Sequence, residues 1–382
     1  MTCEKRSGVN PAAFQLLSRD KSIPTRYPVL ACLGLTLASC NVVKHLDKKN
    51  TKMFQRSGLQ AYTFTDAAGP HFAWATETRT SKPKLMLVHG ITSSGGMWSG
   101  NLAALKEHYD LIVPDLIGHG RSTDTWSGNS VEAQTAHLAL LLDSLGVREP
   151  VFVVGNSYGG AVSANFAERY PERTRALVIY DGPANTYTKA IADSAARAAG
   201  AKDILDFFDT RTPEDQGRNF NTILSKPRRI PRFALRQFCE AGRERKSVYL
   251  GLLKDLLDRE QEYTTKRYMW TMPVYVLWGE DDRLIPPHVG RGIVRTNELP
   301  ADHLIMVPGA GHVANIEQPK VFGAHLMRVL KDGACADPAL KSDGPCTMEF
   351  DPYCGCDGRT YSNRCAAWRA GVRVIARGEC AP

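Results

Sequence analysis

Six short apolar runs, separated by longer amphipathic stretches, lie between residues 84 and 308 of the chain. The runs read KLMLVH, DLIVPD, VFVVG, ALVIYD, VYVLWG and HLIMVP. Continuous apolar strands are typical of a parallel sheet whose two faces are both covered by helices. Segments such as SVEAQTAHLALLLDSLG and YGGAVSANFAERYP supply helices between the runs. The pattern therefore predicts an α/β fold with a doubly wound, mostly parallel sheet.

Two segments depart from this alternation. LQAYTF and HFAWATE flank residues Asp66–Pro70 and predict an antiparallel hairpin at the start of the fold. Between Asp181 and Pro273, roughly ninety residues have helical patterns but no convincing strand, which predicts a helical cap over residues 182–272. The cap carries the basic run SKPRRIPRFALRQFCEAGRERK, which we interpret as a solvated helical face, with an anion-binding surface as the alternative.

Composition places the chain among ordinary folded proteins. Hydrophobic residues make up 43% of it and charged residues 23%, so a sizeable core is available. The net charge is +8, and Lys and Arg are mostly interleaved with acidic residues. This distribution predicts no nucleic-acid partner.

The first fifty residues do not belong to the alternating pattern. Arg26 precedes VLACLGLTLAS, an apolar run too short to span a membrane but suited to the central region of an export signal. The run ends in LASC, which resembles the lipobox of bacterial lipoproteins. That resemblance implies a signal peptide over residues 1–39, acylation of Cys40, and a tether over residues 40–58 that leads from a membrane of the bacterial cell envelope. An ordinary secretory signal, with release to the periplasm or the extracellular space, is the alternative.

Six of the ten cysteines lie in the last 48 residues: Cys335, Cys346, Cys354, Cys356, Cys365 and Cys380. An even and dense set predicts a disulfide framework and hence an oxidising compartment, in agreement with the export signal. Zinc is the competing interpretation, but the segment has no His and lacks paired C-x-x-C elements. We therefore expect a small disulfide-rich domain at the C-terminal end.

One serine has the sequence context of a catalytic nucleophile. Residues 155–159, GNSYG, fit the pattern G-x-S-x-G between a predicted strand and a predicted helix. There the Ser157 hydroxyl projects at a helix N-terminus, where the dipole and free N–H groups favour developing negative charge. A general base is needed, and His312 follows the last predicted strand at the same edge of the sheet. The carboxylate that orients such a base is offered by Glu280, Asp281 and Asp282, and we assign structural or backbone roles to the histidines His89, His119, His303 and His325.

Four motifs, in the right order, resemble those of the α/β-hydrolase family over residues 59–331: LVHGITSSGGMW, DLIGHGRS, WGEDDRLIP and GAGHVANIEQP. The resemblance implies that Ser157 is the nucleophile, His312 the general base and Asp282 the orienting acid. Some members carry the acid after the preceding strand, where this chain has Asp181, and that alternative stays open. The backbone N–H groups of Ile91 and Tyr158 are the implied oxyanion donors, and no metal or organic cofactor is implied.

These residues predict an exported serine hydrolase that cleaves a small-molecule carboxylic ester or lactone through an acyl-enzyme. Serine at the nucleophile position argues against the dehalogenases and epoxide hydrolases of the same family. GNSYGG and WGEDDR also resemble the C–C bond hydrolases, which stay open as the alternative. Those enzymes usually carry H-G-x-G-P where this chain has His89–Ser93, and the departure favours an ester or lactone.

The C-terminal segment CTMEFDPYCGCDGRTYSNRC resembles the Kazal family of serine protease inhibitors, and we place this domain at residues 335–382. The resemblance implies a reactive bond between Met348 and Glu349, and a serine protease with an apolar specificity pocket as partner. The alternative is a recognition or spacer module that inhibits nothing. Positions that match the family imply the disulfides Cys346–Cys365 and Cys354–Cys380. The family's partner for the first cysteine falls where this chain has Trp368, and Cys356 is the cysteine left over, so Cys335–Cys356 is the expected third pair.

Overall fold

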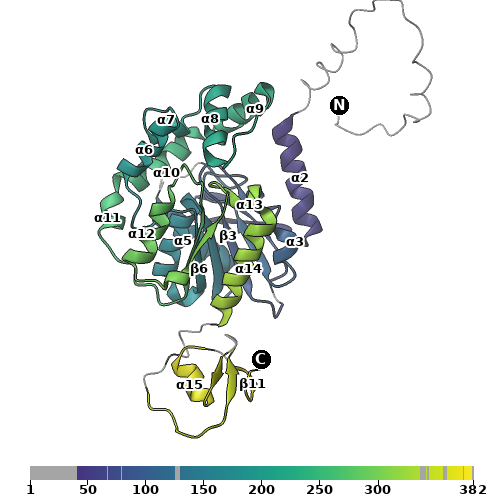
Figure 1. Cartoon of the computed structure of the whole chain (residues 1–382). Helices are drawn as coiled ribbons and strands as arrows, with labels where there is room; N and C mark the ends of the chain where they lie inside the picture. The colour runs from purple at the N-terminus through teal and green to yellow at the C-terminus, as the bar shows by residue number, and fades with distance from the viewer. Residues whose placement is uncertain are drawn as a thin grey trace, which may run out of the picture.

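A computed structural model describes residues 41–66, 68–78, 80–124, 130–335, 341, 344–355, 359–372 and 374–380 (Figure 1). The predicted signal peptide and Cys40 lie outside this part of the chain. Within it, an eight-stranded sheet has the order β1-β2-β4-β3-β5-β6-β7-β8. Its strands are β1 (Gln60–Asp66), β2 (Gly69–Ala75), β3 (Lys84–Val88), β4 (Asp110–Pro114), β5 (Val151–Asn156), β6 (Thr174–Tyr180), β7 (Val274–Gly279) and β8 (Leu304–Val307).

The strand pairing confirms the predicted fold class. β1 and β2 form the expected antiparallel hairpin, with Gln60 opposite Ala75, and β2 continues antiparallel onto β4. The pairs from β4 through β3, β5, β6 and β7 to β8 are all parallel. The carboxyl ends of β3 to β8 therefore meet at one edge of the sheet, where sites of α/β folds are built.

Helices cover both faces of the sheet: α3 (Leu102–Leu105), α4 (Val131–Ser144), α5 (Tyr158–Arg169), α12 (Pro287–Thr296), α13 (Ala314–Glu317) and α14 (Pro319–Cys335) (Figure 1). Alternate residues of the central strands enter two separate cores. In β3, Met86 and Val88 pack in the core that includes α4, α5 and α12. Leu85 and Leu87 pack in the other core, which includes α3 and α14. Burial on both faces explains why these strands are apolar throughout.

The interval between β6 and β7 folds as a helical cap, as predicted. Its helices are α6 (Lys189–Ala198), α7 (Ile204–Phe208), α8 (Pro213–Ile223), α9 (Arg232–Arg243), α10 (Lys246–Asp258) and α11 (Glu260–Thr264). The sequence around Thr212 favours the start of α8, because Thr212 and Asp215 form a capping box and a proline occupies the first turn. The Arg259 guanidinium donates to both carboxylate oxygens of Glu132, at 2.7 and 2.9 Å, and joins the cap to α4.

The segment expected to be a tether, residues 40–58, contains a packed helix, α2 (Val42–Arg56). Asn41 caps this helix by accepting a hydrogen bond from the Lys44 N–H at 2.9 Å. Phe54 is fully buried and stacks on Trp74 with 5.0 Å between ring centroids. Most of the segment expected to be a tether is therefore helical and held against the body by Phe54 and by the contact of Val42 with Gln237, and its role as a tether stays a prediction. In the described part of the chain, α2 and the other helices are all too short or too polar to cross a membrane.

The C-terminal domain is built on a small antiparallel sheet of the order β10-β9-β11, with one helix, α15 (Arg364–Arg369). Its strands are β9 (Tyr353–Gly355), β10 (Thr360–Tyr361) and β11 (Val374–Arg377). It contains two of the three expected disulfides, Cys346–Cys365 and Cys354–Cys380. Cys335, at the end of α14, is also disulfide-bonded, but its expected partner Cys356 lies outside the described residues.

Two histidines are buried side by side in the body. The rings of His71 and His137 lie 4.5 Å apart between centroids, and Nε2 of His71 is 2.8 Å from the Asp66 carboxylate. Burial, together with the nearby His71, lowers the pKa of His137 to about 3. A histidine in the unfolded chain has a pKa of about 6.5, so the unfolded state binds more protons at this position between pH 6.5 and 3. The fold therefore loses stability as the pH falls through this window.

We predict that replacing His137 by Gln makes the free energy of unfolding less dependent on pH below about 6.5. The expected change is on the order of 1 kcal/mol for each pH unit, because one proton no longer binds on unfolding. Urea unfolding at pH 7, 6, 5 and 4 measures how the free energy of unfolding changes with pH, for the parent and for the variant. His108→Gln, at an exposed histidine between α3 and β4, is the control. An equal pH dependence of the free energy of unfolding for the parent and His137→Gln would contradict the lowered pKa of His137.

Candidate active site

Ser157 occupies a strained turn between β5 and α5. Its backbone has φ 54° and ψ −126°, a region that non-glycine residues seldom adopt. The turn is possible because its neighbours lack side chains: a Cβ on Gly155 would lie 2.1 Å from the carbonyl oxygen of Gly159. A Cβ on Gly159 would lie 2.3 Å from the carbonyl oxygen of His89. The two glycines of the motif are thus required by the packing of the turn against β5 and the end of β3.

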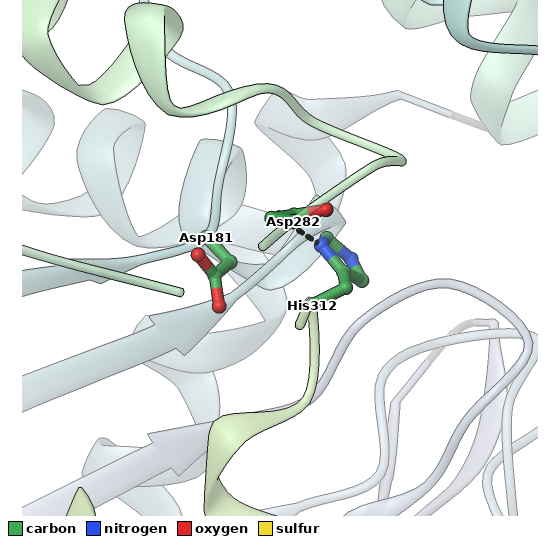
Figure 2. Close-up of side chains that lie close together, drawn as sticks. All are labelled: Asp181, Asp282 and His312. Carbon is green, nitrogen blue, oxygen red and sulfur yellow. Dashed lines mark hydrogen bonds and ion pairs between the residues drawn. The ribbon is translucent and has the colours of Figure 1, made fainter. Parts of the chain in front are cut away.

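His312 and Asp282 form a buried pair next to this turn (Figure 2). Nδ1 of His312 lies 2.7 Å from Oδ2 of Asp282. The other carboxylate oxygen, Oδ1, accepts the backbone N–H groups of Leu284 and Ile285 at 2.8 and 3.0 Å. These contacts hold the carboxylate in one orientation, so Nδ1–H of His312 donates to it and Nε2 is left as the available base. The neighbouring Asp281 is exposed.

The chain brings the His312 loop against the serine turn. The side-chain amide of Asn156 donates to the carbonyl oxygens of His312 and Tyr180, at 3.3 and 3.4 Å. Gly90 borders the same turn, since a Cβ there would lie 2.9 Å from Cβ of Ser157. Among the contacts of the described residues, no hydrogen bond joins the Ser157 hydroxyl to the His312 ring. Catalytic hydrogen bonds are often long in ligand-free enzymes and shorten with substrate bound.

Asp181, the alternative acid, lies beside the pair without bonding to His312 (Figure 2). Its Oδ1 accepts the Gly279 N–H at 2.8 Å, and Oδ2 has no hydrogen-bond partner in the described structure. Burial and the nearby Asp282 charge hold the pKa of Asp181 well above its ordinary value. Asp181, Asp282 and His312 are close enough to hold a cation together. However, Asp282 and Oδ1 of Asp181 already accept hydrogen bonds, which leaves this group poorly suited to a metal ion.

The other candidate histidines lie in structural positions, as the sequence suggested. Nδ1 of His89 donates to the Gly90 carbonyl at 2.8 Å, while its Nε2 accepts the Leu116 N–H at 3.0 Å. Burial lowers the pKa of His89, so the ring stays neutral and fixes the turn that ends at Gly90. His119 contacts the carbonyl of Ile117, and His303 contacts the carbonyl of Val274.

An apolar pocket, which we call the serine pocket, lies between Ser157 and the cap. Ile91 and Tyr158 line it at the level of the serine. Its free volume of about 20 Å³ holds about one water molecule. No local pattern marked the residues that close it, because α7 and α10 reach Ser157 only through the folded cap. These residues are Ile204, Phe208, Leu253, Leu256 and Leu257.

Glu317 is a further residue whose role the sequence did not reveal, although it lies in the quoted motif GAGHVANIEQP. Its carboxylate accepts the Gly311 N–H at 2.7 Å, next to His312. It also accepts the backbone N–H and the hydroxyl of Ser225, both at 2.8 Å. Glu317 therefore joins the His312 loop to the segment that follows α8 of the cap.

These features have close parallels among known proteins. The sequence matches the alpha/beta hydrolase fold family over residues 83–319, which is more than half of the chain. The chain belongs to the α/β-hydrolase family. Residues 326–370 match the Kazal-type serine protease inhibitor domain, which confirms the identity of the C-terminal domain.

Relatives of this α/β-hydrolase include lipases. Lipase 1 of Psychrobacter immobilis is 27% identical over 295 residues, which cover 75% of this chain and 91% of the relative. Lipase 3 of Moraxella sp. (strain TA144) is 26% identical over 303 residues, which cover 77% and 94%. The solved structure of a bacterial membrane phospholipase A has a TM-score of 0.65 at 21% identity, covering 80% of this chain and 96% of that one. The α/β-hydrolase domain of this chain is thus an esterase-like hydrolase domain.

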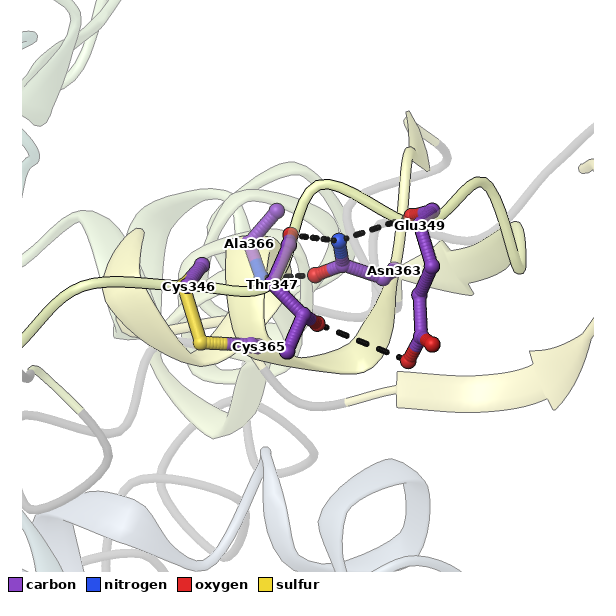
Figure 3. The surroundings of a disulfide bond; sticks show 6 residues. All are labelled: Cys346, Thr347, Glu349, Asn363, Cys365 and Ala366. Atoms are coloured by element: carbon purple, nitrogen blue, oxygen red, sulfur yellow. Dashed lines mark hydrogen bonds between the residues drawn. A yellow bond between two sulfur atoms is a disulfide. The ribbon is translucent and has the colours of Figure 1, made fainter.

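A second candidate site lies in the Kazal domain. Met348 is 100% exposed, with Phe350 also exposed two residues on. The side-chain amide of Asn363 donates to the carbonyl oxygens of Thr347 and Glu349, at 2.9 and 3.1 Å, and so fixes the backbone on both sides of Met348 (Figure 3). The disulfide Cys346–Cys365 adjoins this segment. An exposed side chain on a fixed backbone suits insertion into a partner's pocket.

We predict unequal effects for the three acidic residues near His312. Asp282→Asn should lower kcat/KM for ester hydrolysis on the order of a thousandfold, because His312 loses the acceptor that fixes its tautomer. Asp181→Asn should change it only a few-fold, since Asp181 makes no bond to His312 and its one hydrogen bond, from the Gly279 N–H, can be accepted by the amide oxygen. Asp281→Asn is the exposed control. A larger loss for Asp181→Asn than for Asp282→Asn, measured on folded proteins, would reverse the assignment.

Proposed function

We propose that this chain is an exported serine hydrolase that cleaves a carboxylic ester or lactone through an acyl-enzyme. One observation carries the proposal: Ser157 lies on a strained turn at an apolar pocket, beside the buried His312–Asp282 pair. A nucleophile, a base with its free nitrogen and a fixed carboxylate are the parts that acyl transfer needs.

The proposed reaction has two halves. Nε2 of His312 takes the Ser157 hydroxyl proton as Oγ attacks the acyl carbon, and the tetrahedral intermediate collapses when His312 passes that proton to the leaving alcohol. Water then enters, loses a proton to His312 and attacks the acyl-enzyme, which releases the acid and restores the Ser157 hydroxyl. Asp282 stabilises the imidazolium form of His312 in both halves.

Ile91 and Tyr158 are the proposed oxyanion donors. Both line the serine pocket together with Ser157. Tyr158 is the first residue of α5, where the helix supplies no internal acceptor for the backbone N–H. The close approach of Gly90 to Ser157 brings the turn that ends in Ile91 to the same point. Removal of one such donor typically costs on the order of 3 kcal/mol of transition-state stabilisation.

The lining of the serine pocket suits an apolar acyl group, which the cap would cover. Its cap residues are aliphatic or aromatic, and it contains no charged side chain among its described lining residues. Because the free volume is about 20 Å³, the cap must move to admit an acyl chain. The lipase relatives agree with an ester substrate. A C–C bond substrate would carry a charged acid group, for which this pocket offers no partner.

The disulfides support the proposed export, because such bonds form in oxidising compartments. We propose that residues 1–39 direct this export and that acylated Cys40 holds the enzyme at a membrane. A second function is proposed for the Kazal domain: inhibition of a serine protease with an apolar pocket, through the exposed Met348 and the bond to Glu349.

The esterase proposal predicts turnover of p-nitrophenyl esters by residues 41–382, which contain every described helix and strand. Activity should depend on acyl chain length, and Ser157→Ala should lower kcat by more than about a thousandfold. Ser163→Ala, a buried serine on α5, is the matched control. Folded parent protein that turns over no ester would reject the ester proposal and direct attention to C–C substrates.

The inhibitor proposal predicts that the same protein blocks elastase-like or subtilisin-like proteases. Met348→Lys should abolish inhibition, because an apolar pocket does not accept a charged side chain without a partner. Ser157→Ala should inhibit as well as the parent, which separates this function from ester hydrolysis. Unchanged protease activity with excess parent protein would leave the domain as a recognition or spacer module.

A further inference from the structure

The positive charge of the chain is concentrated in α2 and in residues 226–243 of the cap. Together these segments hold eleven Lys and Arg residues and two acidic residues, whereas the whole chain has an excess of eight basic residues. The rest of the chain therefore has no net positive charge. Dense basic clusters of this kind, one of them on an amphipathic helix, are typical of surfaces that bind anionic lipids.

The basic side chains on these segments face solvent. Lys44, Lys48 and Lys52 are exposed and lie four residues apart, on one side of α2, while Phe54 is buried on another. In the described structure these lysines are in no ion pair, and Asp47 pairs with Arg121 instead. In the cap segment, the exposed side chains in no described ion pair include Arg228, Arg229 and Arg236.

The two segments lie side by side. The backbone N–H of Val42, at the start of α2, donates to Oε1 of Gln237 on α9 at 2.7 Å. Figure 1 shows this end of α2 next to α9, at the cap end of the molecule. Lys44, Lys48, Lys52, Arg228, Arg229 and Arg236 thus lie on two adjacent segments, and we call these six residues the basic surface.

The arginines of the basic surface follow a segment that contacts the candidate active site. The cap segment begins just after Ile223, whose carbonyl accepts the His312 N–H at 2.8 Å. The guanidinium of Arg283 donates to the carbonyl of Leu224 at 2.6 Å, which fixes the next residue of the connection. A partner bound to the arginines that follow would therefore lie beside the cap and the His312 loop.

We propose that the basic surface binds the anionic phospholipid headgroups of a bilayer and turns the cap toward the membrane. The charge of the surface is opposite to that of anionic headgroups. Its position favours a bilayer over other polyanions, because α2 begins two residues after Cys40, the predicted acylation site. A lipid chain together with a polybasic patch attaches a protein to a membrane more firmly than either does alone. The proposal depends on charge and placement and does not require the Ser157 chemistry.

The test measures binding of residues 41–382, which lack Cys40, to phosphatidylcholine vesicles with and without phosphatidylglycerol. Two triple variants remove equal charge from the two halves of the surface: Lys44, Lys48 and Lys52→Gln, and Arg228, Arg229 and Arg236→Gln. The matched control removes the same charge from exposed positions of α14: Lys320, Arg328 and Lys331→Gln. Hydrolysis of a soluble ester reports on folding of each variant, and Ser157→Ala shows whether binding is independent of catalysis.

We expect the parent, Ser157→Ala and the α14 control to bind vesicles that contain phosphatidylglycerol. Each surface triple should bind roughly tenfold or more weakly, with soluble-ester hydrolysis unchanged. Binding should also weaken between about 0.05 M and about 0.5 M NaCl, because salt screens exposed charges. Equal binding by the surface triples and the control would overturn the proposal. So would equal binding of the parent to vesicles without phosphatidylglycerol, or binding to heparin or RNA with none to vesicles.

Discussion

The close backbone packing around Ser157 is the constraint on which the rest of the site depends. A non-glycine residue keeps a positive φ there because β5 and α5, on both sides of it, are buried. Gly90 meets the turn from β3, and a Cβ on Gly160 would lie 2.8 Å from Cα of Gly182, just after β6. Three strand ends thus converge within van der Waals distance. A side chain added at any of these glycines would move the serine away from its partners.

The remaining parts of the site are fixed by loops at the same edge of the sheet. Backbone N–H groups after β7 orient Asp282, and Asp282 in turn orients His312. Glu317 and the carbonyl of Ile223 connect the His312 loop to the cap, so the cap both closes the serine pocket and contacts the loop of the base. The cap and the loop that carries the base are therefore joined by a few hydrogen bonds.

The sequence predicted what local patterns determine. Runs such as VFVVG gave the strands because strands buried on both faces are apolar throughout, and G-x-S-x-G marked the turn because only glycines fit beside it. Contacts between distant segments were missed: the aliphatic residues of α10 reach Ser157 from about a hundred residues away, and no local signal marks them. The helix α2 was missed because Phe54 is its only fully buried side chain, and its other contacts are polar ones to distant segments, such as Gln237. The resemblance implied Asp282 and left Asp181 open, and the structure adds the 2.7 Å contact between Asp282 and His312 that Asp181 does not make.

The central claim is that Ser157 is activated as a nucleophile, and covalent labelling tests it most directly. Residues 41–382 would be treated with a fluorophosphonate, which reacts with activated serine hydroxyls, and the modified peptide would be identified by mass spectrometry. The account predicts one label per chain on Ser157, with labelling slowed at least about a hundredfold in His312→Ala. Labelling of a different serine, or none on Ser157 in the folded protein, would contradict it.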